Sequence, residues 1–110
     1  MKILVIDYSG ENILQSHIPS GHEIMLEQSD GMNAYRVAGE WVPDIILVNG
    51  QAKPGHNRQT ILAIQRRKKT NKIPVYIVNA PGKDTTNSGL LSTNILSGDI
   101  RKLFSQKVKR

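Results

Sequence analysis

The run of branched apolar residues at 45–48 constrains the fold of this chain more than any other segment. Pro43 and Asp44 precede the run and Asn49 follows it. A short run of Ile, Leu and Val is typical of a strand that is buried on both faces, as in a parallel sheet. The carboxyl end of such a strand is where open α/β sheets place their sites. An aspartate there could be a nucleophile or a metal ligand, whereas the amide of Asn49 is neither a useful nucleophile nor a charged ligand.

Three other short segments rich in β-formers fit the same sheet. Residues 3–6 and 74–78 predict central strands, and residues 23–26 predict a strand at an edge. Segments with helical character alternate with these strands. This alternation indicates one α/β domain with a parallel sheet and right-handed crossovers.

Four helices are expected between and after the strands. The first is a short amphipathic helix at 11–18 that ends near Pro19. Ser29 or Asp30 can cap the second. Its apolar stripe, with the spacing of a helix, consists of Ala34, Val37, Ala38 and Trp41. The third carries Ile61, Leu62 and Ile64 and ends in a basic run, and the last is marked by Ile100, Leu103, Phe104 and Val108.

The segment 81–89 does not fit the alternation, because it contains no large apolar residue. Such a segment cannot bury a helical face and is typical of a loop. The crossover helix before the fifth strand is therefore expected to be shortened or absent. The fifth strand itself must come from one of two pairs, Leu90 and Leu91 or Ile95 and Leu96.

Composition narrows the class of protein. The 110 residues predict a single domain, 1–110, long enough to form a core without cross-links. The absence of cysteine excludes disulfides, thiolate nucleophiles and cysteine metal sites, and it suits a cytoplasmic protein. Since no apolar run approaches the roughly 20 residues of a membrane span, we expect no membrane insertion.

The net charge of +6 raises the question of an anionic partner. Part of the excess lies in four consecutive residues, Arg66, Arg67, Lys68 and Lys69, which are candidate anion contacts, and part lies in residues 101–110. Solvated helix ends explain such charges without any partner. Nucleic-acid binding is kept as an alternative, although one Phe and three Tyr offer few surfaces for base stacking.

Five segments in this order resemble the receiver domains of bacterial two-component response regulators. They are residues 2–7, 29–31, 43–49, 53–55 and 73–80. The resemblance covers nearly the whole chain. It implies a flavodoxin-like α/β/α fold with a five-stranded parallel sheet in the order 2-1-3-4-5.

The resemblance also implies a phosphorylation site, of which most parts are missing here. Active receivers accept a phosphoryl group on an aspartate, with Mg²⁺ held by neighbouring carboxylates. Asn49 stands at the acceptor position, Tyr8 replaces the second carboxylate of the pair that Asp7 begins, and Asn79 replaces the switch hydroxyl. The position of the family's lysine is also not basic. We therefore predict a degenerate pocket that consists of Asp7, Tyr8, Asn49 and Asn79, without Mg²⁺ and without enzymatic activity.

A pseudo-receiver of this kind is expected to act by contact with a protein partner in a signalling pathway, without phosphorylation. The candidate partner surface consists of Leu90, Leu91, Ile95 and Leu96, although all four can equally belong to the core. A dimer is a further possibility. A small ligand in the crevice at the strand ends is an alternative function, but no residue pattern identifies such a ligand.

Overall fold

The computed structural model describes residues 1–29, 31–80 and 92–108, with the backbone alone for 105–108. Its five strands form one sheet in which every neighbouring pair is parallel, in the order β2-β1-β3-β4-β5. The strands are β1 (Lys2–Ile6), β2 (Glu23–Glu27), β3 (Ile45–Asn49), β4 (Val75–Val78) and β5 (Thr93–Ile95). The α/β fold and the strand order predicted from the sequence are therefore confirmed.

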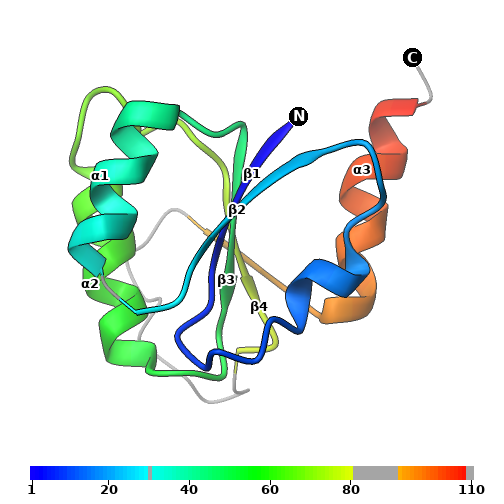
Figure 1. Cartoon of the computed structure of the whole chain (residues 1–110), viewed down its shortest axis with the longest axis horizontal. Helices are drawn as coiled ribbons and strands as arrows, with labels where there is room; N and C mark the ends of the chain where they lie inside the picture. Colours follow the sequence, from blue (N-terminus) through cyan, green and yellow to red (C-terminus); the bar gives the residue numbers. More distant parts are fainter. Residues whose placement is uncertain (30, 81–91, 109–110) are drawn as a thin grey trace.

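Helices cover both faces of this sheet (Figure 1). One face carries α1 (Gly31–Trp41) and α2 (Pro54–Gln65). The other carries the short 3₁₀ helix η1 (Leu14–His17) and the C-terminal helix α3 (Ile100–Val108), which follows the 3₁₀ turn η2 (Ser97–Asp99). In the part of the chain that the structure describes, no helix is both long and apolar enough to cross a membrane.

The central strands are buried on both faces, as the sequence predicts. Leu4, Ile6, Ile46 and Val48 pack against α1 and α2, and the alternating residues Ile3, Val5, Ile45 and Leu47 pack against η1 and α3. Side chains of successive strand residues point to opposite faces, so each strand contributes to two core clusters. All eight side chains are at most 6% exposed.

The predicted helix at 11–18 is wrong in type and length. Only the four residues of η1 are helical there, in a single 3₁₀ turn. Gly10 and Asn12 both adopt left-handed backbone conformations, with φ of 77° and 60°. Such residues interrupt a right-handed helix, and Pro19 prevents its continuation.

Two other boundaries differ from the prediction. The fifth strand is Thr93–Ile95, so Ile95 belongs to it and Leu96 lies beyond its end. Helix α2 ends at Gln65, and the basic residues 66–69 form the turn that follows it rather than its last turn. The crossover helix expected to be shortened or absent falls on 81–89, which lies outside the described residues, as do Leu90 and Leu91.

Candidate functional site

The parallel register brings the predicted pocket residues to one edge of the sheet. Asp7 follows β1, Asn49 ends β3 and Asn79 follows β4. Ile6 pairs with Val48, and Asn49 pairs with Val78, so the three chain ends lie side by side. Sequence order alone therefore placed these residues correctly at the carboxyl ends of the strands.

Asp7 and Asn49 form a buried hydrogen-bonded pair. The Asn49 side-chain amide donates to Asp7 Oδ1 at 3.1 Å and lies 3.4 Å from Ser9 Oγ. Asp7 Oδ1 also accepts from the backbone N–H and the hydroxyl of Ser9, at 3.0 and 2.5 Å. Asn49 Oδ1 accepts from the backbone N–H of Gln51 at 3.0 Å. Both the nitrogen and the oxygen of the Asn49 side chain thus form hydrogen bonds within the protein.

This arrangement stabilises one buried carboxylate by donors from the chain itself. Asp7 is fully buried and Asn49 is 4% exposed. Three donors converge on Oδ1, whereas Oδ2 has no hydrogen-bond partner among the described residues. Burying a charge is costly unless it receives such hydrogen bonds. Asp7 and Asn49 therefore bond loop amides and each other, as residues of these types often do at strand ends.

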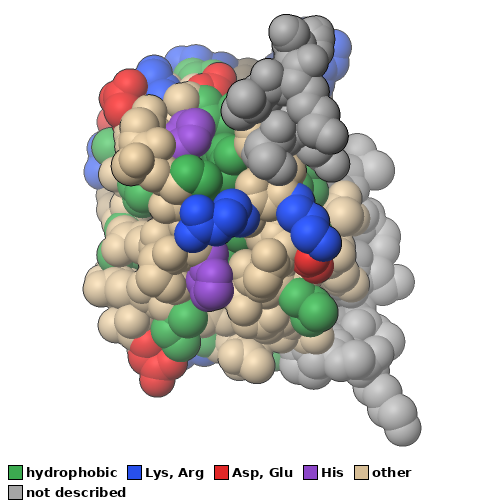
Figure 2. Space-filling model, turned by 90° about the vertical axis from the view of Figure 1, so that its right-hand side faces the viewer, with side chains coloured by type: hydrophobic (Ala, Val, Ile, Leu, Met, Phe, Trp, Pro, Cys, Tyr) green, Lys and Arg blue, Asp and Glu red, His purple; other side chains and the backbone are tan. Residues whose placement is uncertain are grey.

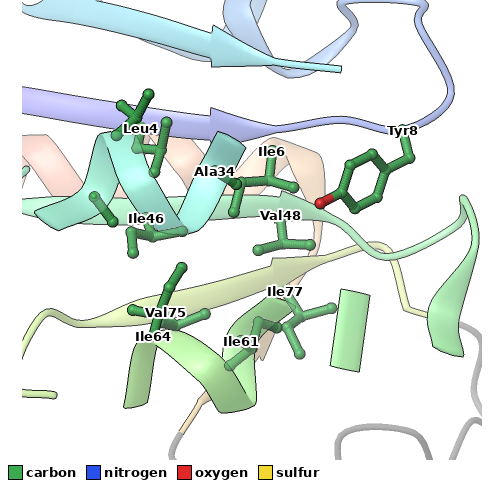
Figure 3. Close-up of a cluster of buried hydrophobic side chains, with 12 residues drawn as sticks. Leu4, Ile6, Tyr8, Ala34, Ile46, Val48, Ile61, Ile64, Val75 and Ile77 are labelled. Carbon is green, nitrogen blue, oxygen red and sulfur yellow. The ribbon is translucent and has the colours of Figure 1, made fainter. Parts of the chain in front are cut away.

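Tyr8 lies in the core cluster between the sheet and α2 (Figure 3). It is 6% exposed and is therefore a core side chain rather than a surface one. Its hydroxyl lies 2.9 Å from Thr60 Oγ1, and its ring contacts the His56 ring at a centroid distance of 4.4 Å. The Tyr8 side chain thus connects the end of β1 to helix α2.

Asn79 has a different set of partners. Its backbone is left-handed, with φ of 58°, and its side-chain oxygen accepts from the backbone N–H of Ser97 at 2.9 Å. Its own backbone N–H donates to Ile95 at 2.8 Å. Asn79 therefore ties β4 to the end of β5, and the hydrogen bonds described here do not join it to Asp7.

Asn57 and Thr60 were missed by the sequence analysis. The amide of Asn57, a buried residue, donates to the backbone oxygens of Asn49 and Ala52, at 3.1 and 2.9 Å, and so holds the loop after β3. Thr60 pairs with Tyr8 and donates to the His56 carbonyl at 3.0 Å. Both share a helical face with Ile61 and Ile64. Polar residues on an apolar stripe were the signal that could have identified them.

The four basic candidates have different environments. Arg66, Lys68 and Lys69 are exposed. Arg67 is half-buried, because its guanidinium lies 4.3 Å from the centre of the Tyr35 ring and donates to the Tyr35 carbonyl at 3.0 Å. A Cβ at Gly39 would lie 2.2 Å from Arg67 Nη1, so the glycine makes room for this contact. Arg67 thus connects α1 to the turn after α2.

The candidate partner surface is only partly within the described residues. Ile95 is half-buried against the cluster that contains Phe104, whereas Leu96 is 65% exposed. Figure 2 shows the side of the molecule that carries α3, and its hydrophobic side chains form small separate patches. Of the two candidate partner-surface residues that the structure describes, Leu96 is the exposed one.

A groove of about 520 Å³ between α1 and α2 was not anticipated from the sequence. It is lined by Gly31, Met32, Tyr35, His56, Gln59, Thr60, Ala63 and Arg66. Met32 is 82% exposed, the largest exposed fraction among the exposed large apolar residues of the described chain. The groove lies on the opposite side of the sheet from α3.

Comparisons with known proteins support the fold and leave the function open. No protein-family model and no curated protein matches the chain. The chain is similar to a solved structure described as yeast Spc42 trimeric coiled-coil amino acids 181–211 fused to another structure. The identity is 23%, the TM-score is 0.66, and the match covers 99% of this chain and 76% of that one. Because a coiled coil contains no strands, the similarity concerns the rest of that fused chain.

Proposed function

We propose that this chain is a pseudo-receiver, a flavodoxin-like domain that regulates a protein partner in bacterial signalling without being phosphorylated. The observation that carries this proposal is the hydrogen bond from the Asn49 amide to the Asp7 carboxylate. At the position where an active receiver holds its phosphoacceptor, this chain has a donor that stabilises the neighbouring charge. The parallel order β2-β1-β3-β4-β5 supports the resemblance on which the assignment rests.

The donor set at this edge does not fit Mg²⁺. Magnesium requires oxygen ligands in near-octahedral geometry and usually one or two carboxylates. Asp7 supplies one carboxylate, the Asn49 oxygen already accepts from Gln51, and the Tyr8 hydroxyl is directed at Thr60. Among the described residues, no group of three His, Cys, Asp or Glu side chains could hold a metal. The amide of Asn49 at the position of the acceptor aspartate is not a useful nucleophile, which supports a non-enzymatic role.

Asn79, at the position that would respond to phosphorylation, already has hydrogen-bond partners within the protein. In the family that the chain resembles, a hydroxyl at the position of Asn79 reads the modified aspartate. Here Asn79 accepts from Ser97 and holds β4 to β5. A fixed contact of this kind favours a constitutive surface over a switch, so we propose recognition of a cytoplasmic protein partner by a single conformation.

A phosphorylation assay tests the proposal. The ¹⁵N-labelled chain is incubated with acetyl phosphate and Mg²⁺, and separately with beryllium fluoride and Mg²⁺, while amide chemical shifts are recorded. We expect no shifts at Asp7, Asn49 or Gln51 and no gain of mass. Shifts that are confined to these residues would contradict the proposal. An active receiver measured in parallel verifies the reagents.

Nucleic-acid binding is the second candidate function, because Arg66, Lys68 and Lys69 are exposed within one turn. Such binding would be dominated by phosphate contacts and would weaken steeply with salt. A mobility-shift titration with duplex and single-stranded DNA at low and moderate salt tests it. Failure to bind at low salt would exclude this function.

A further inference from the structure

The groove between α1 and α2 has walls that are fixed at both ends. At the start of α1, Gly31 approaches α2 so closely that a Cβ there would lie 2.7 Å from Thr60 Oγ1. At the other end, Arg67 reaches back from the turn after α2 to the ring and carbonyl of Tyr35. The groove is therefore formed before any ligand arrives, which lowers the entropic cost of binding.

The middle of the groove is apolar and accessible. Met32 is 82% exposed, and Tyr35 and Ala63 are half-buried beside it. A flexible methionine adapts its shape to different apolar side chains, which is why methionines are frequent at binding surfaces. A cavity of about 520 Å³ is in the size range of pockets that bury a ligand or an anchoring side chain.

The end of the groove towards the C-terminus of α2 is positively charged. Arg66 lines the groove there, and the exposed Lys68 and Lys69 continue the charge beyond it. Within the described residues, the ion pairs join Arg36 to Glu40 and Lys102 to Asp99, so Arg66 has no acidic partner there. An apolar cavity beside uncompensated cations is complementary to a ligand that is apolar and anionic at once.

We propose that this groove binds a short acidic segment of the partner protein, with one large apolar side chain among Met32, Tyr35 and Ala63 and a carboxylate at Arg66. The proposal rests on the proposed function, since it names the surface and the partner's chemistry. An acidic peptide fits better than a nucleic acid for two reasons. A phosphate backbone would leave the apolar cavity unfilled, and Arg67 already covers the Tyr35 ring that a base would use for stacking.

A synthetic peptide pair provides the probe. The first peptide has about 12 residues, matching the length of α2, and combines Glu with Leu or Phe at helical spacing. The second has Lys in place of every Glu. Fluorescence anisotropy measures the affinity, and amide shifts of the ¹⁵N-labelled chain locate the site. We expect the acidic peptide alone to bind, with a Kd below about 1 mM, and to shift Met32, Tyr35, Ala63 and Arg66.

Matched variants distinguish binding in the groove from non-specific attraction between the acidic peptide and the basic protein. Arg66→Glu should weaken binding about tenfold, and Met32→Ser, which removes an exposed side chain, should weaken it several-fold. Arg101→Glu makes the same charge change on α3, on the other side of the sheet, and should leave the affinity within about twofold. Amide spectra verify that each variant is folded.

Any of four outcomes would overturn the inference. Three of them concern the peptide: no binding of the acidic peptide at about 1 mM, equal weakening by Arg66→Glu and Arg101→Glu, and displacement of the peptide from the same residues by DNA that binds more tightly. A groove filled by a second copy of the chain, seen as a dimer that Met32→Ser dissociates, would also overturn it. Each of these leaves the phosphorylation assay unaffected, so failure of the inference and failure of the proposed function are distinguishable.

Discussion

The edge of the sheet at Asp7 and Asn49 and the groove between α1 and α2 use their polar groups in opposite ways. At the sheet edge, the side chains bond one another and the loop backbone, and both are buried. In the groove, Met32 is exposed and Arg66 has no acidic partner among the described residues. The difference between the two regions is that the buried strand ends are closed to a partner, whereas the groove between α1 and α2 is accessible. A buried side chain whose hydrogen bonds are made within the protein, such as the amide of Asn49, contributes to stability, whereas binding a partner requires exposed groups.

Among the substitutions considered, Asn49→Asp should have the largest effect on stability, because it adds a second charge at the buried sheet edge. It places a carboxylate oxygen where Nδ2 now lies, 3.1 Å from Asp7 Oδ1, in a buried position. Repulsion between two such charges costs about 4 kcal/mol at intermediate dielectric. We expect a loss of this order in the free energy of unfolding at pH 7, measured by urea denaturation.

The destabilisation of this variant should depend on pH and on Mg²⁺. Repulsion raises the pKa of one carboxyl above the ordinary value for Asp of about 3.9. The penalty is therefore full above the raised pKa and diminishes as the pH falls through it. Mg²⁺ should raise the Tm of Asn49→Asp and leave that of the unsubstituted chain unchanged. Asn49→Ala removes the amide without adding a carboxylate, so Mg²⁺ should leave its Tm unchanged.

Gly50→Ala should have the next largest effect, because it disturbs the packing beside the same edge. A Cβ at Gly50 would lie 2.8 Å from Ile77 Cγ2 and 2.9 Å from the backbone of Ala80, which cannot rotate away. Overpacking of this kind costs up to about 3 kcal/mol. Gly55→Ala is the control, since a Cβ there meets nothing within 4 Å. Equal stability of the two variants would contradict the close packing of this edge.

Tyr8→Phe should lower the stability by a smaller amount. It removes the hydroxyl that pairs with Thr60 at 2.9 Å while the ring keeps its contact with His56. A buried hydrogen bond contributes about 1 kcal/mol to stability. Tyr76→Phe, the same change in a half-buried residue on the other face, should stay within about 0.5 kcal/mol. Thermal unfolding of the two variants at one pH measures the difference.

The smallest effect is expected for Arg66→Ala, within about 0.5 kcal/mol. Its neighbour Arg67 lies on the Tyr35 ring and donates to the Tyr35 carbonyl, so Arg67→Ala should cost about 1 kcal/mol. Urea denaturation of both variants tests whether the two arginines differ as described. If Arg66→Ala is the more destabilising, then Arg66 is held within the fold and is not available to a ligand.

Much of the fold followed from local patterns. The apolar runs at 3–6 and 45–48 predicted strands that are buried on both faces, and the stripe from Ala34 to Trp41 predicted α1, because these periodicities follow from backbone geometry. The helix expected at 11–18 did not form at its predicted length, and the reason is also local. Left-handed residues at Gly10 and Asn12 limited it to one turn, and composition alone did not reveal their φ angles.

Two properties of this protein follow directly from its amino-acid sequence. The sequence specified the parallel sheet, through runs of Ile, Leu and Val that are stable only when covered on both faces. It also specified the chemistry at the end of β3, because an amide at Asn49 cannot supply a nucleophilic carboxylate whatever surrounds it.

The directions of the side chains near the end of β3 depend on how the folded elements pack together. Tyr8 reaches Thr60 across 52 positions of sequence, and Arg67 reaches Tyr35 across 32. Such contacts depend on how closely two helices approach over the sheet, a distance that is set by the packing of many residues at once. The α1–α2 groove exists for the same reason, since its walls belong to segments that meet only after folding.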